Sequence, residues 1–267
     1  MRICCLGDLL LDVIVRLDGP VLSDTDTYGS TRVGAGGQAA NVAAWAASLG
    51  AEARFVGKRA RDPAGRIAGE ELRRRGVEIE GPELPAGTGT VVSLATPDGE
   101  RAMLSDRGVA TSFGPDELEP AWLDACDWLH IPGYSLTGPP LADTARRAAS
   151  LADRVSVDLS STAAIEAVGV DTFAVRLEEL RPRVVFATEA EAELMGRLTA
   201  QTVVVKRGAR GCTVRQNGSE RSYDALPATL VDATGAGDAF AAGFLLGGPE
   251  LALEAAARCV GQMGAMP

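Results

Sequence analysis

The chain has very little histidine, lysine or aromatic side chain for its 267 residues. Histidine occurs once, at His130, which excludes a histidine-rich metal site and argues against a Ser-His-Asp hydrolase. Lysine occurs only at Lys58 and Lys206, and the formal net charge is −10. Nucleic acids and anionic membranes require a basic face, so we expect neither as a partner.

Cysteine patterns and long apolar segments are also lacking. The five cysteines are odd in number and form no C-x-x-C pair, which favours reduced thiols over a disulfide framework. The apolar N-terminus is interrupted by Asp8 and Asp12, so it resembles neither a signal peptide nor a membrane span. These features predict a soluble, cytoplasmic protein.

Two common nucleotide-binding motifs are absent. The sequence has no G-x-x-x-x-G-K-[ST] segment, because Gly57-Lys58 is followed by arginine and position 52 is glutamate, which excludes a P-loop NTPase. Residues 34–39 fit G-x-G-x-x-A formally. However, they do not close the first strand, and no acid ends the next one to hold a ribose, which argues against a dehydrogenase.

The most informative segment present is 231–240, VDATGAGDAF, where a glycine-rich turn leads into an apolar helix. Gly235 and Gly237 permit close approach of the backbone, and the helix starting near Ala236 directs unpaired N–H groups toward the same space. Such a helix start is suited to phosphate or to charge developing on a transferred phosphoryl group. Asp238 at its mouth is placed to accept a proton from an attacking hydroxyl.

Two segments about 200 residues apart resemble the signatures of one enzyme family. Residues 232–240 are similar to the C-terminal signature of the ribokinase-like (PfkB-type) carbohydrate kinases, and residues 36–43, GGQAANVA, resemble the N-terminal one. Further agreement comes from Gly7-Asp8 with Asp12, from residues 99–101 with 106–108, and from residues 206–211, KRGARG. The resemblance covers essentially the whole chain.

The resemblance implies that Asp12, Gly36, Gly37 and Asn41 bind the hydroxyls of a sugar. The chemistry agrees, because a carboxylate accepts bidentate hydrogen bonds and a glycine pair at a helix start leaves N–H groups accessible. Other roles remain open from the sequence alone. Asp12 could be a solvated charge at a strand end, and Asn41 a polar residue on an exposed helix face.

For the metal, the resemblance points to an Asn-x-x-Glu motif that this chain carries as residues 188–191, TEAE. Glu191 matches the family glutamate, and Thr188 replaces the asparagine, so we expect altered rather than absent Mg²⁺ positioning. A helix N-terminal acid favoured by the dipole is the alternative role for Glu191. Asp232, with Thr234, is implied to have a structural or monovalent-cation role.

The segment 206–211 resembles the nucleotide-side loop of the family. We therefore assign Lys206, Gly208, Gly211 and Thr234 to nucleotide binding. Lys206 stands where a small polar residue is usual, and it suits contact with the triphosphate as well as a solvated strand end. The sequence stops at Pro267, close to where the family usually runs on, which leaves activation by K⁺ in doubt.

Short apolar runs alternate with amphipathic stretches, as expected for a mostly parallel sheet covered by helices on both faces. Residues 12–33 and 88–104 break the alternation, read as strands and include a turn at 97–99. The resemblance implies a ribokinase-like three-layer α/β fold in which these segments form a small β-sheet lid. We expect one domain, 1–267, and a homodimer through the lid.

The sequence thus predicts ATP-dependent phosphorylation of a primary hydroxyl on a small sugar or sugar-like molecule. Asp238 is the predicted base, and Gly235, Ala236 and Gly237 form the anion hole. A nucleoside kinase of the same family, for adenosine or pseudouridine, would share these residues. A catalytically weak ATP-binding regulator also remains open because of Thr188 and the short C-terminus.

Overall fold

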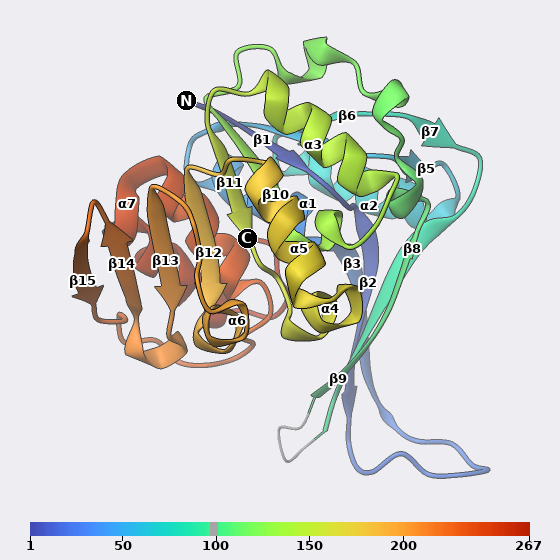
Figure 1. The fold of residues 1–267 in the computed structure, drawn as a ribbon. Helices are drawn as coiled ribbons and strands as arrows, with labels where there is room; N and C mark the ends of the chain where they lie inside the picture. The colour runs from blue at the N-terminus through green and yellow to red at the C-terminus, as the bar shows by residue number, and fades with distance from the viewer. Residues whose placement is uncertain (97–100) are drawn as a thin grey trace.

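A computed structural model describes residues 1–96 and 101–267 (Figure 1). Residues 97–100, and with them the expected turn at 97–99, lie outside the described part, as does the side chain of Arg101. The chain forms one large sheet, one four-stranded sheet and a two-stranded sheet of β5 (Arg59–Ala60) and β7 (Glu83–Leu84).

The large sheet is mostly parallel, and its strand order is β15-β14-β13-β12-β11-β10-β1-β4-β6. Only β14 and β15 at one edge pair antiparallel. The strands are β1 (Arg2–Leu6), β4 (Glu52–Val56), β6 (Val77–Glu80), β10 (Trp128–Pro132), β11 (Val155–Asp158), β12 (Val184–Thr188), β13 (Thr202–Lys206), β14 (Cys212–Gln216) and β15 (Ser219–Tyr223).

Helices cover both faces of this sheet. Successive residues of each buried strand point to opposite faces, so each strand contributes apolar side chains to two hydrophobic cores. Ile3 and Cys5 of β1 belong to the hydrophobic core under α1 (Gln38–Ser48), α2 (Pro63–Arg74) and α7 (Ala236–Val260). Cys4 and Leu6 belong to the second core. That core lies under α3 (Leu141–Leu151), α4 (Thr162–Val168), α5 (Val170–Glu179) and α6 (Glu189–Met195). The three-layer α/β prediction is confirmed.

Helix α7 is interrupted after its first half. Gly247 and Gly248 have non-helical dihedral angles, and Pro249 follows them, so the chain turns here between two helical stretches. Within the described residues, α7 is the one helix whose length and apolar composition would also suit a membrane span. Ala239, Phe240 and other α7 residues are buried in the core with α1, so core packing accounts for this composition.

The smaller sheet, hereafter the small sheet, has the order β3-β2-β8-β9. Its strands are β2 (Leu10–Leu17), β3 (Gly29–Gly36), β8 (Thr88–Ala95) and β9 (Arg101–Gly108). They lie in the predicted lid regions but run further, to residues 10, 36 and 108. Figure 1 shows the sheet projecting from the rest of the molecule as a long arm.

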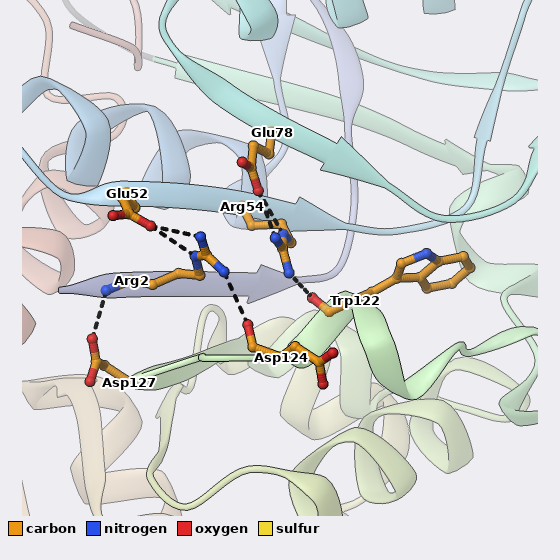
Figure 2. Close-up of polar contacts among 7 residues, drawn as sticks. All are labelled: Arg2, Glu52, Arg54, Glu78, Trp122, Asp124 and Asp127. Atoms are coloured by element: carbon orange, nitrogen blue, oxygen red, sulfur yellow. Dashed lines mark hydrogen bonds and ion pairs between the residues drawn. The ribbon is translucent and has the colours of Figure 1, made fainter.

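Charged residues fasten the segment 120–124 to the strands near the amino ends of β1 and β4 (Figure 2). Arg2 pairs with Glu52 and donates to the carbonyl of Asp124. Arg54 pairs with Glu78 and donates to the carbonyl of Trp122. All five cysteines are free thiols, as predicted, and all but Cys126 are buried.

Candidate active site

The glycine turn, residues Gly235–Gly237, opens helix α7 in a conformation that depends on glycine. Gly235 has φ +80°, and a Cβ there would lie 2.6 Å from the backbone of Ala265. No described side chain caps the helix start with a hydrogen bond. The backbone N of Ala236 donates to the carbonyl of Ala233 at 3.3 Å, so the N–H groups of Gly237 and Asp238 are the ones that keep their capacity to bind an anion.

Asp238 lies in the first turn of α7 and is only 8% exposed. Its Oδ2 accepts a 2.8 Å hydrogen bond from Nδ2 of Asn41 on α1. Burial is the main cause that raises the pKa of Asp238 to about 7. The hydrogen bond from Asn41 and the positive charge of Lys206 lower this pKa, while the negative charge of Asp158 raises it. A carboxylate with such a pKa near neutrality is suited to general-base catalysis.

Asp12 of β2 lies directly over Gly36 at the end of β3. A Cβ on Gly36 would come within 2.0 Å of the Asp12 carboxylate, so only glycine permits this placement. Burial raises the pKa of Asp12 to about 7, with further contributions from Asp8 and Glu71. Gly37, the N-cap of α1, has φ +96°, and a Cβ there would lie 2.5 Å from the carbonyl oxygen of Asp8. The segment of Asp8 and Asp12 therefore lies against the N-terminal signature segment.

Three buried oxygens here have no hydrogen-bond partner among the described residues: Oδ1 of Asp8, Oδ1 of Asp12 and Oδ1 of Asn41. A buried polar atom without a partner costs free energy, and such atoms at a cleft commonly receive theirs from a ligand. All three are acceptors. The arrangement suits a ligand rich in hydroxyl donors, as the sequence predicts for Asp12 and Asn41.

Arg107 connects the small sheet with this site. From β9 it forms a 3.0 Å ion pair with Asp8 and lies over the ring of Tyr134, 4.5 Å from its centroid. The sequence alone leaves Arg107 open between contact with substrate or phosphate and a plain surface charge, and it gives Asp8 no role. Only the strand pairing of the small sheet shows that they meet.

Lys206 and Asp158 form a buried ion pair at the carboxyl ends of β13 and β11. Nζ of Lys206 lies 3.3 Å from the position a Cβ would take on Gly237. Burial alone would lower the pKa of Lys206, but Asp158, and to a smaller extent Glu191 and Asp238, raise it above its usual value. Lys206 is thus a charged group beside the glycine turn rather than a solvated strand end. Nothing in the sequence singles out Asp158, which reads as an ordinary acid at a strand end.

Glu191 forms a reciprocal capping box with Thr188 at the start of α6. Oε2 of Glu191 accepts from the backbone N of Thr188 at 2.7 Å, and Oγ1 of Thr188 accepts from the backbone N of Glu191 at 3.3 Å. Burial, and next Asp158, raise the pKa of Glu191. The helix-cap role of Glu191 is therefore present, while metal binding remains a prediction.

Asp232 stabilises the glycine turn through hydrogen bonds to the residues beside it. Its Oδ1 accepts from the backbone N and Oγ1 of Thr234 at 2.9 and 2.8 Å, and its Oδ2 accepts from the backbone N of Gly264 at 3.1 Å. The described residues contain no cluster of three or more His, Cys, Asp or Glu suited to a metal ion. Metal or monovalent-cation binding by Asp232 stays a prediction, as does nucleotide binding by Thr234.

Gly208 and Gly211 are needed by the loop after β13. Their φ angles are +57° and +81°, and a Cβ on Gly211 would lie 2.0 Å from the carbonyl oxygen of Tyr223. Backbone conformation accounts for both glycines, and their contact with a nucleotide stays a prediction. Like Asp158, Thr188 and Lys206, this loop lies at the carboxyl ends of the parallel strands, where open α/β sheets bind ligands.

Comparison with known proteins agrees with this geometry. The family described as "pfkB family carbohydrate kinase" matches residues 1–266. The chain belongs to this family. The predicted resemblance and the prediction of a carbohydrate kinase are therefore confirmed.

Proteins similar to this kinase are named for different activities. It is 32% identical over 269 residues to the ATP-dependent ribose-1-phosphate kinase of Halopiger xanaduensis, covering 97% of this chain and 90% of that protein. The crystal structure of adenosine kinase from Sinorhizobium meliloti superposes with a TM-score of 0.89 at 26% identity, covering 100% and 95% of the two chains. A putative ribokinase II from E. coli, solved with ATP and Mg²⁺, superposes with a TM-score of 0.84 at 21% identity, covering 99% and 94%.

Proposed function

We propose that this kinase transfers the γ-phosphoryl group of ATP to a hydroxyl, preferably a primary one, of a small sugar or sugar-like molecule. The observation that carries the proposal is the buried 2.8 Å contact between Asn41 and Asp238. It joins the helix that starts at Gly37 to the helix that starts at the glycine turn. An acceptor bound at the first helix start therefore lies beside an anion hole and a base.

In the proposed reaction, Asp8, Asp12 and Asn41 accept hydrogen bonds from the acceptor's hydroxyls, with Gly36 and Gly37 leaving room for close approach. Asp238 takes the proton of the attacking hydroxyl. That oxygen forms the new bond to the γ-phosphorus while the bond to the leaving ADP oxygen breaks. The N–H groups of Gly237 and Asp238 stabilise the phosphoryl oxygens.

The nucleotide is proposed to lie along the glycine turn toward Lys206, Thr234 and the loop of Gly208 and Gly211. The single positive charge of Lys206 lies among three buried carboxyl groups, those of Asp158, Glu191 and Asp238. This excess of acidic groups fits a divalent cation. Glu191 would hold Mg²⁺ through water, since the described side chains form no all-protein cage. When bound, Mg²⁺ neutralises charge on the β- and γ-phosphates.

The small sheet is proposed to act as the lid. Besides Arg107, it reaches the glycine-turn side through Arg16, which donates to the carbonyl of Val231, and Arg32, which donates to that of Met263. A sheet held against both sides of the site would exclude water from the transfer. We further propose that residues 1–267 act as one domain, in the cytoplasm, and as a homodimer through the lid.

A nucleoside acceptor is the second candidate, supported by the similarity to the Sinorhizobium meliloti adenosine kinase at a TM-score of 0.89. The proposed catalytic residues would be the same, and the ribose hydroxyls of a nucleoside could use the same acceptors. Activity on adenosine or pseudouridine over free sugars would favour this candidate.

The experiment is ADP release from MgATP with ribose, fructose, 2-keto-3-deoxygluconate, ribose 1-phosphate, adenosine and pseudouridine. Wild type is compared with Asp238→Asn and with Glu254→Gln, an exposed acid on the same helix. We expect one acceptor to stimulate turnover, and the rate to fall about 10²- to 10⁴-fold in Asp238→Asn alone. ATP binding without turnover on any acceptor would contradict the proposal and favour a regulator. Unchanged turnover in Asp238→Asn would remove Asp238 as the base.

A further inference from the structure

The ion pair of Lys206 and Asp158 is one end of a polar chain that crosses the site. The other oxygen of Asp158, Oδ1, accepts from the backbone N of Ser160 at 3.0 Å. Oγ of Ser160 donates to Oε1 of Gln38 at 2.5 Å and accepts from the backbone N of Gly133 at 2.8 Å. Gln38 is the first residue of α1. The chain therefore links the acceptor-side helix start to the glycine turn.

Asp158 is fixed more firmly than the lysine it holds. It is 1% exposed at the end of a central strand, and the backbone of Ser160 fixes one of its oxygens. Lys206 has a flexible side chain of four carbons, and the negative charges of Glu191 and Asp238 also attract its ammonium group. Without Asp158, these two carboxylates would be the remaining attractions for Nζ. A lysine moved onto Asp238 would neutralise the base.

We propose that Asp158 is a positioning residue that holds Nζ of Lys206 beside Gly237, where the lysine contacts the γ-phosphoryl group during transfer. The inference rests on the proposed function and assigns a role to a residue outside the family signatures. The placement of Nζ 3.3 Å from a Cβ position on Gly237 puts its charge where negative charge develops on the transferred group. The same placement keeps Nζ away from the carboxylate of Asp238, the proposed base.

The test uses a mimic of the transferring phosphoryl group, MgADP with aluminium fluoride, and measures its affinity beside that of MgADP alone. Lys206→Met and Asp158→Asn should each weaken the fluoride-dependent binding about 10- to 100-fold, with MgADP affinity nearly unchanged. In turnover, kcat should fall while KM for MgATP stays close to that of wild type. A loss of MgADP affinity equal to the loss with aluminium fluoride would overturn the proposal.

The double variant separates positioning from an independent contribution. If Asp158 acts through Lys206, Asp158→Asn should add almost nothing in the Lys206→Met background. Additive losses would show that the two residues act separately, against the proposal. A merely structural role for the pair would lower the thermal unfolding temperature without changing the fluoride-dependent tightening.

A matched control exists in the edge hairpin of the large sheet. Arg215 on β14 and Glu220 on β15 also form an ion pair, but both side chains are largely exposed. Arg215→Met and Glu220→Gln should leave both affinities unchanged. Wild type that shows neither fluoride-dependent tightening nor acceptor-dependent turnover would refute the proposed function itself. Tightening in wild type that survives both Lys206→Met and Asp158→Asn would refute only this inference.

Discussion

Nδ2 of Asn41 donates to Oδ2 of Asp238 in the buried interior, although 197 residues separate the two along the chain. The contact ties α1 to α7 and lowers the pKa of Asp238 against the effect of burial. Because each signature segment supplies one partner, the base acquires its protonation behaviour only when the two halves of the fold come together.

Asn41→Ala should shift the low-pH limb of the plot of kcat against pH to higher pH. Loss of the hydrogen bond raises the pKa of Asp238 above about 7. A base must be deprotonated to act, so kcat should fall several-fold at pH 7 and recover at higher pH. The measurement is kcat at saturating acceptor between pH 5.5 and 9.5. Ser48→Ala, an exposed change on the same helix, is the control. A profile that drops equally at every pH would contradict this role.

Gly36→Ala should damage acceptor binding rather than nucleotide binding. A Cβ would lie 2.0 Å from the Asp12 carboxylate, so the carboxylate must move away from the acceptor. We expect the acceptor KM to rise at least about tenfold, as for loss of a charge-assisted hydrogen bond, with MgADP affinity unchanged. Gly19→Ala, where a Cβ would meet nothing within 4 Å, should be neutral. Equal effects of the two substitutions would argue against the placement of Asp12.

Much of this site could be predicted from the sequence, because local pattern specifies local structure. Apolar runs and glycine-led helix starts predicted the strands, the helices and the glycine turn. The partners across the site could not be predicted. Asp158 meets Lys206, and Arg107 meets Asp8, only through strand order and the placement of the small sheet, which no periodicity encodes. The hairpin of β14 and β15 was missed for a simpler reason, since its outer strand, SERSY, is polar and exposed.

Asp238→Asn should stabilise the free enzyme at alkaline pH even though it lowers activity. The pKa of Asp238 is raised from 3.8 to about 7 by folding, so the native state binds the proton more tightly than the unfolded state. That contribution is fully present below pH 3.8 and is lost as the pH rises through 7. The gain of Asp238→Asn should therefore grow between pH 4 and 7 and level off above, at no more than about 4 kcal/mol. Thermal unfolding from pH 5 to 8.5 measures it, and a gain independent of pH would contradict the raised pKa.

Asp232→Ala should destabilise the glycine turn. The carboxylate accepts hydrogen bonds from Thr234 and Gly264, and it is 4% exposed, so its loss should cost about 2–4 kcal/mol of unfolding free energy. Denaturant unfolding measures this cost. Exchange of Na⁺ for K⁺ in the wild-type assay tests the predicted cation role separately. K⁺ stimulation that disappears in a folded Asp232→Asn variant would support that role, and an identical rate in both salts would exclude it.

The small sheet should mediate self-association through its exposed apolar side chains. Val33 on β3 and Met103 and Leu104 on β9 are each at least half exposed, at the two edge strands of the sheet. Exposed strand edges with apolar side chains favour pairing with a second chain. We expect a dimer by light scattering, and a monomer for Leu104→Glu with an unchanged unfolding temperature. Leu151→Glu, at an exposed leucine of α3 outside the small sheet, should leave the dimer intact. A monomeric wild type, or a dimer that survives Leu104→Glu paired with Val33→Glu, would contradict association through this surface.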